Sequence, residues 1–162
     1  MGRLSALGTR HYRPHQWDEV SNWKLYPMGR GEKWMGFDAI CDLDGLPPEI
    51  LLVPLPGHTW GHSGVAIDTG AGWLLYCGDA YFYHGEVGRK TPKCPPGMAL
   101  YQTMMEVDCA ARVNNQKRLR SLSLDRKSEV TLFCAHDRVE FDRMRYAVKR
   151  EEGRPRLSPG NS

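Results

Sequence analysis

The sequence lacks the features of secreted, membrane-spanning and disulfide-rich proteins. Its cysteines are odd in number and form no CxxC pair, which argues against a disulfide framework. The opening residues contain no apolar core of a secretory signal. No apolar run reaches the ~20 residues that a membrane-spanning helix needs. We therefore predict a cytoplasmic protein that has no membrane partner.

A strong charge imbalance is also absent. The 22 Lys and Arg residues nearly balance the 19 Asp and Glu residues, which leaves a formal net charge of +3. Binding to nucleic acid needs positive charge gathered on one face. The basic residues from Arg138 to Arg150 alternate instead with acidic ones, which is typical of a solvated helix face. This pattern disfavours a nucleic-acid partner and predicts the helical ion pairs Glu140–Arg143 and Asp142–Arg145.

Short apolar runs predict four main strands in a chain of 162 residues. Those over residues 64–69 and 73–78 face each other across a Gly-Ala-Gly turn, so we expect them to pair. The run ILLVPL is typical of a strand buried on both faces. Residues 32–41 predict a further strand or a hairpin arm broken at Gly36. The four main strands are expected at residues 50–55, 64–69, 73–78 and 129–135.

Two helices are predicted around the last strand. Apolar residues at steps of three and four predict a long helix over residues 98–122 that buries Met98, Tyr101, Met105 and Cys109. Leu119 and Leu122 continue this apolar stripe. Its charged residues, Arg112, Lys117 and Arg120, are expected in water. The helix after residue 135 is expected to bury Phe141, Met144 and Val148.

The order of strands and helices predicts an α/β layered domain. We assign the domain to residues 32–150. Residues 1–31 are predicted to form an irregular entry segment, and residues 151–162 a disordered polar tail.

Three polar residues directly follow predicted strands, where side chains leave the edge of a sheet. They are His58, Asp79 and His136. Each also has a simpler interpretation: a loop histidine, a turn aspartate, and a helix start at which Asp137 is the cap. Taken together, two imidazoles and a carboxylate suit a divalent metal such as zinc. Such a metal would acidify a water molecule and polarise a carbonyl or phosphoryl group.

The segments PGHTWGHS, GDA and AHD carry a family resemblance. In this order they resemble three metal motifs of the metallo-β-lactamase superfamily, over residues 50–144. The resemblance implies half of an αββα sandwich and a hydrolase that is dinuclear in zinc. It implies that His58 binds one zinc, that His136 binds the other, and that Asp79 bridges both and is catalytic. It implies a loop or supporting role for His62.

The family's first motif, HxHxDH, has no counterpart in this sequence. The histidines that precede His58 are His11 and His15, and their spacing of four does not match. The chain is therefore expected to begin inside the family's fold, as a fragment, a gene model with a late start codon or a truncated paralogue. We expect weak or partial zinc binding, and an uncovered sheet face through which the chain could associate with itself.

Three functions remain open at this point. The first is a metal-dependent hydrolase of a small ester, thioester, lactone, amide or phosphoester. In this function Tyr81, Tyr83, His84 and Lys93, from the loop over residues 81–96, are candidates for contact with the substrate. The second is a catalytically dead binding or scaffold module. The third, processing of nucleic acid, is disfavoured by the charge pattern.

Overall fold

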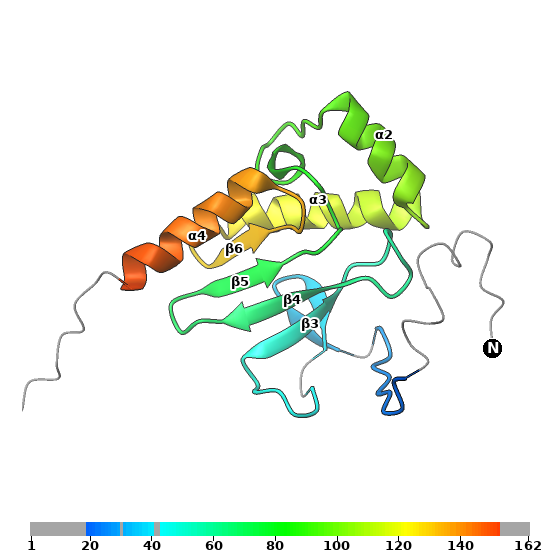
Figure 1. The fold of residues 1–162 in the computed structure, drawn as a ribbon, viewed down its shortest axis with the longest axis vertical. Coiled ribbons are helices and arrows are strands. Elements are labelled where there is room, and N and C mark those ends of the chain that lie inside the picture. Colours follow the sequence, from blue (N-terminus) through cyan, green and yellow to red (C-terminus); the bar gives the residue numbers. More distant parts are fainter. Residues whose placement is uncertain (1–18, 30, 41–42, 153–162) are drawn as a thin grey trace, which may run out of the picture.

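The structure, a computed structural model, describes residues 19–29, 31–40 and 43–152 (Figure 1). Most of the predicted entry segment and tail lies outside these ranges. The elements in chain order are β1 (Glu32–Trp34), β2 (Phe37–Ala39), β3 (Ile50–Pro54), β4 (Ser63–Asp68), β5 (Trp73–Tyr76), the short 3-10 helix η2 (His84–Glu86), α2 (Pro96–Met105), α3 (Cys109–Asp125), β6 (Val130–Phe133) and α4 (Arg138–Glu152).

The four main strands form one sheet in the order β3-β4-β5-β6. Strand β4 is antiparallel to both β3 and β5, while β6 joins β5 in parallel after the chain has passed through α2 and α3. The helices are layered on this sheet (Figure 1). The predicted strands and the mixed α/β class are confirmed. That the sheet is one half of an αββα sandwich stays a prediction.

A small hairpin precedes the sheet. Strands β1 and β2 are antiparallel and turn at Met35 and Gly36, which both have positive φ angles, of 46° and 85°. Two positive φ angles at the centre of a two-residue loop match the twist of the flanking strands. The predicted break at Gly36 is therefore a hairpin turn. A bridge between Ile40 and Leu52 attaches the hairpin to β3.

The core lies between α3 and one face of the sheet. Leu51, Ala66, Leu75 and Leu132 are in register across the four strands, and all are buried. They belong to the same cluster of buried residues as Leu119 of α3. Burying such side chains contributes about 25 cal/mol per Å² of apolar surface, so this layer holds the sheet in place.

The opposite face of the sheet is only partly covered. The neighbouring row of side chains is Leu52, Val65, Tyr76 and Phe133, none of them fully buried. The prediction that residues 50–55 are buried on both faces is therefore wrong, because burial alternates along β3. Self-association through this apolar face stays a prediction.

The predicted long helix is two helices. The helix is interrupted at residues 106–108, where the Val107 and Asp108 amides donate to the carbonyl of Gly57 at 2.8 and 2.9 Å. The Asp108 side chain then accepts from the Ala111 amide and begins α3. These bonds satisfy amides that an uninterrupted helix would have used internally.

The predicted buried stripe is wrong over its first part, whereas Leu119 and Leu122 at its end are buried as predicted. Tyr101 and Cys109 are exposed, and Met98 and Met105 are half-buried. Polar side chains are buried in their place: Gln102, Asn115 and Gln116. Of the charged residues expected in water, only Lys117 is exposed. Arg112 pairs with Glu106 and is 11% exposed at its side chain, and Arg120 donates to the Glu86 carbonyl.

Helix α4 also packs differently from the prediction. Phe141 is 61% exposed and Met144 is half-buried, whereas Glu140 is buried. The side chain of Val148 lies outside the described residues. The predicted pairs Glu140–Arg143 and Asp142–Arg145 are not formed, because Glu140 turns inward and Asp142 pairs with Arg138.

Within the described ranges, no helix combines the length and the apolar character that crossing a membrane requires.

Replacing Leu119 by Ala should lower the free energy of unfolding by about 2–5 kcal/mol, because the change leaves a cavity against the sheet. Leu124→Ala, on the same helix but 39% exposed, is the matched control and should cost less than about 1 kcal/mol. Chemical denaturation followed by circular dichroism measures both. Equal losses would mean that α3 does not pack on the sheet as described.

Candidate functional site

The three residues singled out in the sequence lie together at one edge of the sheet. Strands β3, β5 and β6 run in the same direction, so their carboxyl ends share that edge. His58, Asp79 and His136 each follow one of these strands. The two Asp79 carboxylate oxygens lie 3.4 Å from His58 Nε2 and 2.9 Å from His136 Nε2. The expected convergence of the three side chains is therefore present.

The cluster is open to solvent on one side. The side chains of His58, Asp79 and His136 are 15%, 30% and 56% exposed, so access increases toward His136. Asp79 Oδ1 itself is buried and has no hydrogen-bond partner in the described part of the chain. Its 2.9 Å approach to His136 is therefore a close contact without hydrogen-bond geometry. A buried carboxylate oxygen in this state has lone pairs available to a ligand.

His62 holds the backbone beside Asp79. Its Nδ1 lies 2.9 Å from the Leu55 carbonyl, and the Asp79 amide donates to its Nε2 at 2.9 Å. These two partners fix the tautomer, because Nδ1 must carry the proton while Nε2 accepts one. Both ring nitrogens are therefore occupied, which agrees with the supporting role that the resemblance implies for His62.

The loop that carries His58 is anchored to α3. Asn115 Nδ2 donates to the Pro56 carbonyl at 2.7 Å, and the Gly57 carbonyl accepts the two amides at the start of α3. Gly57 has a φ of +145°, and a Cβ at this position would stand 2.6 Å from the Arg112 backbone. Only glycine permits both this angle and this approach.

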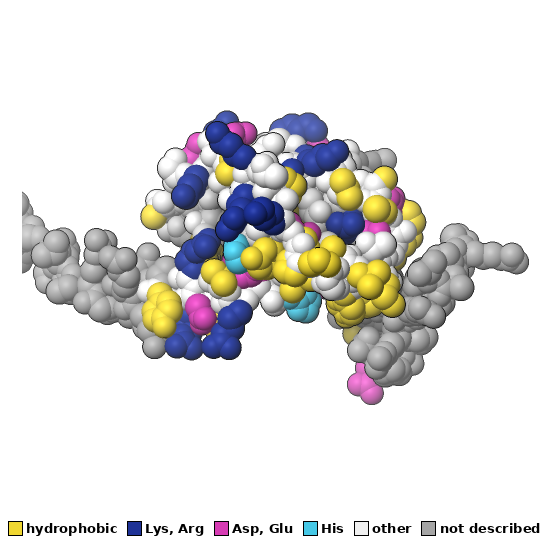
Figure 2. Space-filling model, turned by 90° about the horizontal axis from the view of Figure 1, so that it is seen from above, with side chains coloured by type: hydrophobic (Ala, Val, Ile, Leu, Met, Phe, Trp, Pro, Cys, Tyr) yellow, Lys and Arg dark blue, Asp and Glu magenta, His cyan; other side chains and the backbone are white. Residues whose placement is uncertain are grey.

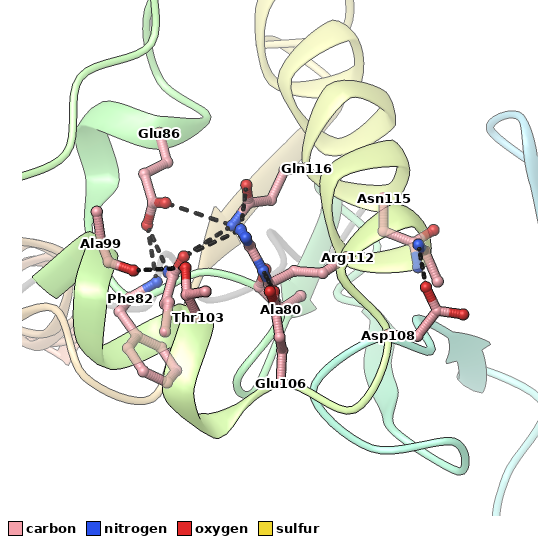
Figure 3. Close-up of polar contacts among 12 residues, drawn as sticks. Ala80, Phe82, Glu86, Ala99, Thr103, Glu106, Asp108, Arg112, Asn115 and Gln116 are labelled. Carbon is pink, nitrogen blue, oxygen red and sulfur yellow. Dashed lines mark hydrogen bonds and ion pairs between the residues drawn. The ribbon is translucent and has the colours of Figure 1, made fainter.

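A buried carboxylate, Glu86, shapes the loop that follows Asp79 (Figure 3). Its Oε2 accepts from the amides of Phe82 and Tyr83 and from Gln102 Nε2 at 2.9–3.1 Å. Its Oε1 accepts from Gln116 Nε2 at 3.3 Å. Four donors compensate the desolvation of this buried carboxylate.

Arg112 extends this network toward the His58 loop. Its Nη1 donates to Gln102 Oε1 at 3.1 Å and to Gln116 Oε1 at 3.0 Å, and its Nε pairs with Glu106 (Figure 3). The guanidinium therefore orients the two amide side chains so that their nitrogens face Glu86.

The Glu86 loop places an aromatic ring beside the imidazoles. The Phe82 ring centroid lies 4.9 Å from that of His136 and 6.1 Å from that of His58. The exposed ring of Tyr101 follows at 5.9 Å from Phe82. Neither Phe82 nor Glu86 was predicted from the sequence as part of the site. A lone acid within an otherwise Gly- and Pro-rich loop was the available signal for Glu86.

The segment that carries His136 is fixed by its neighbour Asp137. Asp137 Oδ1 accepts the Glu140 amide at 3.0 Å, which caps α4 as the sequence suggested. Its Oδ2 accepts from the His84 amide and lies 2.8 Å from His84 Nδ1. Burial raises the pKa of Asp137, but the hydrogen bonds from His84 and the Glu140 amide outweigh it, so the net shift is downward.

Of the four candidate substrate contacts, the one at Tyr81 is wrong, because its side chain is buried and engaged elsewhere. Those at Tyr83, His84 and Lys93 stay predictions. Tyr81 is fully buried and donates to the Glu140 carboxylate at 3.0 and 3.1 Å. His84 is bonded to Asp137. Lys93 lines a different pocket, next to Glu86 and Cys94. Tyr83 is half-buried, and its ring packs on His84.

The donors fit zinc in kind but not in number. Ligand atoms about 2.0–2.1 Å from a tetrahedral zinc lie about 3.3 Å apart, which is close to the His58–Asp79 separation. However, no group of three or more His, Cys, Asp or Glu side chains within the described ranges has the geometry to hold a metal ion. His58, Asp79 and His136 therefore form an incomplete set.

Comparison with known proteins finds two relatives that are named as metallo-hydrolases. A protein named probable metallo-hydrolase from Mycobacterium bovis and one of the same name from Mycobacterium tuberculosis are each 35% identical to this chain over 127 residues. The match covers 78% of this chain and 40% of each relative, so the chain spans about two fifths of their length. No family model matches the sequence.

Two solved structures show a weaker likeness. An N-acyl homoserine lactone hydrolase with N-hexanoyl-L-homoserine at its metal centre is 19% identical, with 64% of this chain and 36% of that chain covered and a TM-score of 0.42. A quorum-quenching N-acyl homoserine lactone hydrolase is also 19% identical, with 75% and 40% covered and a TM-score of 0.40. TM-scores this low do not establish a shared fold.

Gly57→Ala should destabilise the chain by on the order of 1–3 kcal/mol and displace His58, because the new Cβ meets the Arg112 backbone. Gly70→Ala is the control: Gly70 also has a positive φ, of +75°, but no atom lies within 4 Å of its Cβ position. Thermal unfolding and the NMR signals of the His58 ring report the two effects. If both variants lose equal stability and leave the His58 signals unchanged, the loop is not held against α3.

Proposed function

We propose that this chain belongs to the metallo-β-lactamase superfamily and carries part of the zinc site of a metal-dependent hydrolase that acts on a small molecule. The observation that carries the proposal is the approach of two imidazole Nε2 atoms, 3.4 and 2.9 Å away, to the two oxygens of Asp79. Two mycobacterial relatives named probable metallo-hydrolase support it. The activity proposed is that of the whole protein, of which the chain spans part.

The three residues take separate roles in this proposal. His58 and His136 would hold zinc through their ring nitrogens, and Asp79 would hold it through its carboxylate. Zinc supplies Lewis acidity that polarises a carbonyl or phosphoryl group. His62 keeps Asp79 in place by accepting its amide proton, and the Phe82 ring shields one side of the imidazoles from water.

The number of donors limits what the chain does alone. Structural zinc usually has four protein ligands and catalytic zinc three. The described residues supply three donors for two ions, so we propose that zinc binds weakly here. Further ligands would come from an HxHxDH segment, as the family resemblance implies, and this segment would complete the site.

A second candidate is a binding module without catalytic activity. The absence of a complete metal-binding group within the described ranges favours it. In that case the apolar face that includes Leu52, Val65 and Tyr76 would be the functional surface. Metal content separates the candidates, since the hydrolase needs zinc and the module does not.

Zinc titration of the 162-residue chain should show weak binding that depends on Asp79. Asp79→Asn should weaken it about tenfold or more, because second-shell changes alone cost 10–100-fold in other metal sites. Asp68→Asn, at the last residue of β4, is the matched control and should leave zinc binding unchanged. Isothermal titration calorimetry and elemental analysis after dialysis measure the result.

A chain extended by an HxHxDH segment should hold two zinc ions and hydrolyse a member of a panel of esters, lactones and phosphodiesters. Asp79→Ala should abolish that turnover, because Asp79 serves both ions. Tight binding of two zinc ions with turnover in the 162-residue chain itself would show that the ligands lie elsewhere. If neither chain bound zinc and neither showed turnover, the result would favour the binding module.

A further inference from the structure

A second cavity lies away from the candidate zinc site. It has a volume of about 530 Å³ and is bounded by the end of α3, by β6, by the first turns of α4 and by the residues that follow η2. This volume is typical of sites for small molecules, which occupy roughly 300–1,000 Å³. None of His58, Asp79 and His136 lines it.

The inner wall of the cavity is apolar. Val87, Val130 and Leu132 line it and are buried, and Leu124 adds a partly exposed side chain. Three of these residues come from elements of the core, so the wall is held rigidly. A wall of this kind favours an apolar group over water.

The rim of the cavity is cationic. Arg89, Lys127 and Arg143 line it, and none of them has a carboxylate partner or a hydrogen bond within the part of the chain that the structure describes. The neighbouring cations Arg126 and Arg138 pair with Glu129 and Asp142. Figure 2, which views the molecule from above relative to Figure 1, shows Lys and Arg side chains spread over this side of the molecule among hydrophobic ones.

The carboxylate at the cavity does not neutralise this rim. Glu140 lines the wall, but it is buried and accepts hydrogen bonds from Tyr81 and from the Cys134 amide. Burial raises the pKa of Glu140, and these bonds offset the rise only in part. The three cations therefore stay without a carboxylate partner within the described residues, and a bound anion would supply one.

We propose that this cavity binds a phosphomonoester that has an apolar substituent. A phosphomonoester carries about −1.5 to −2 charges at neutral pH and presents three acceptor oxygens, which suits a cavity lined by three cations without carboxylate partners. The apolar substituent lies against Leu124 and Val130. This site takes its ligand independently of the proposed zinc chemistry.

The test uses hexyl phosphate, with inorganic phosphate, hexanoate and hexanol as comparison ligands, in calorimetric titrations of the 162-residue chain. Hexyl phosphate should bind at least about tenfold more tightly than each of the three, because only it has both the dianion and the tail. Tighter binding of hexanoate would overturn the assigned head group. Equal binding of hexanol would overturn the role of the cations.

Variants locate the binding in this cavity. Arg89→Gln, Lys127→Gln and Arg143→Gln should each weaken the binding of hexyl phosphate about three- to tenfold. The matched control is Lys117→Gln, on the exposed face of α3 and outside the cavity, which should leave it unchanged. Leu124→Ala should weaken the binding of hexyl phosphate but not the binding of inorganic phosphate. The proposal would be overturned if all four charge variants changed the affinity for hexyl phosphate equally. It would also be overturned if no ligand showed saturable binding.

Discussion

The burial of the Glu86 carboxylate is the constraint from which the arrangement around the candidate site follows. A carboxylate removed from water costs several kcal/mol unless donors replace the lost hydration. Its donors come from the loop after Asp79, from Gln102 of α2 and from Gln116 of α3. The two helices must therefore present amide side chains inward, and the loop must turn its backbone toward them. Phe82 reaches the imidazoles because this loop has no freedom to move away.

The candidate site is assembled from loops, yet each loop is attached to a rigid element. Asn115 and the amides at the start of α3 hold the His58 loop, His62 holds the Asp79 backbone, and Asp137 holds the start of α4 beside His136. These attachments are hydrogen bonds to backbone groups, which fix position more narrowly than apolar contacts do. The stability of α3 and the placement of His58 are consequently linked, since the same residues serve both.

The sequence was a good guide to the strands and to the three residues that follow them. A buried strand leaves a run of apolar residues, and the shared direction of β3, β5 and β6 brings the next side chains to one edge. It was a poor guide to the helices, because the spacing of apolar residues predicts that the polar Gln102 and Gln116 lie on the surface. Phe141 was placed inside and Glu140 outside for the same reason. Partners such as Tyr81, which lies 59 positions from Glu140 in the chain, leave no local pattern.

The parallel pairing of β5 with β6 also sets an order of events during folding. Strands β3, β4 and β5 follow one another along the chain, connected by residues 55–62 and 69–72, whereas Trp73 pairs with Val130 across the whole of α2 and α3. Closing so long a loop costs conformational entropy before any contact repays it, which favours addition of β6 after the β3–β4–β5 meander has formed. His58 and Asp79 then meet early, and His136 arrives only with the last strand. An incompletely folded chain therefore presents one imidazole beside one carboxylate, and the second imidazole completes the cluster only after the last strand has been added.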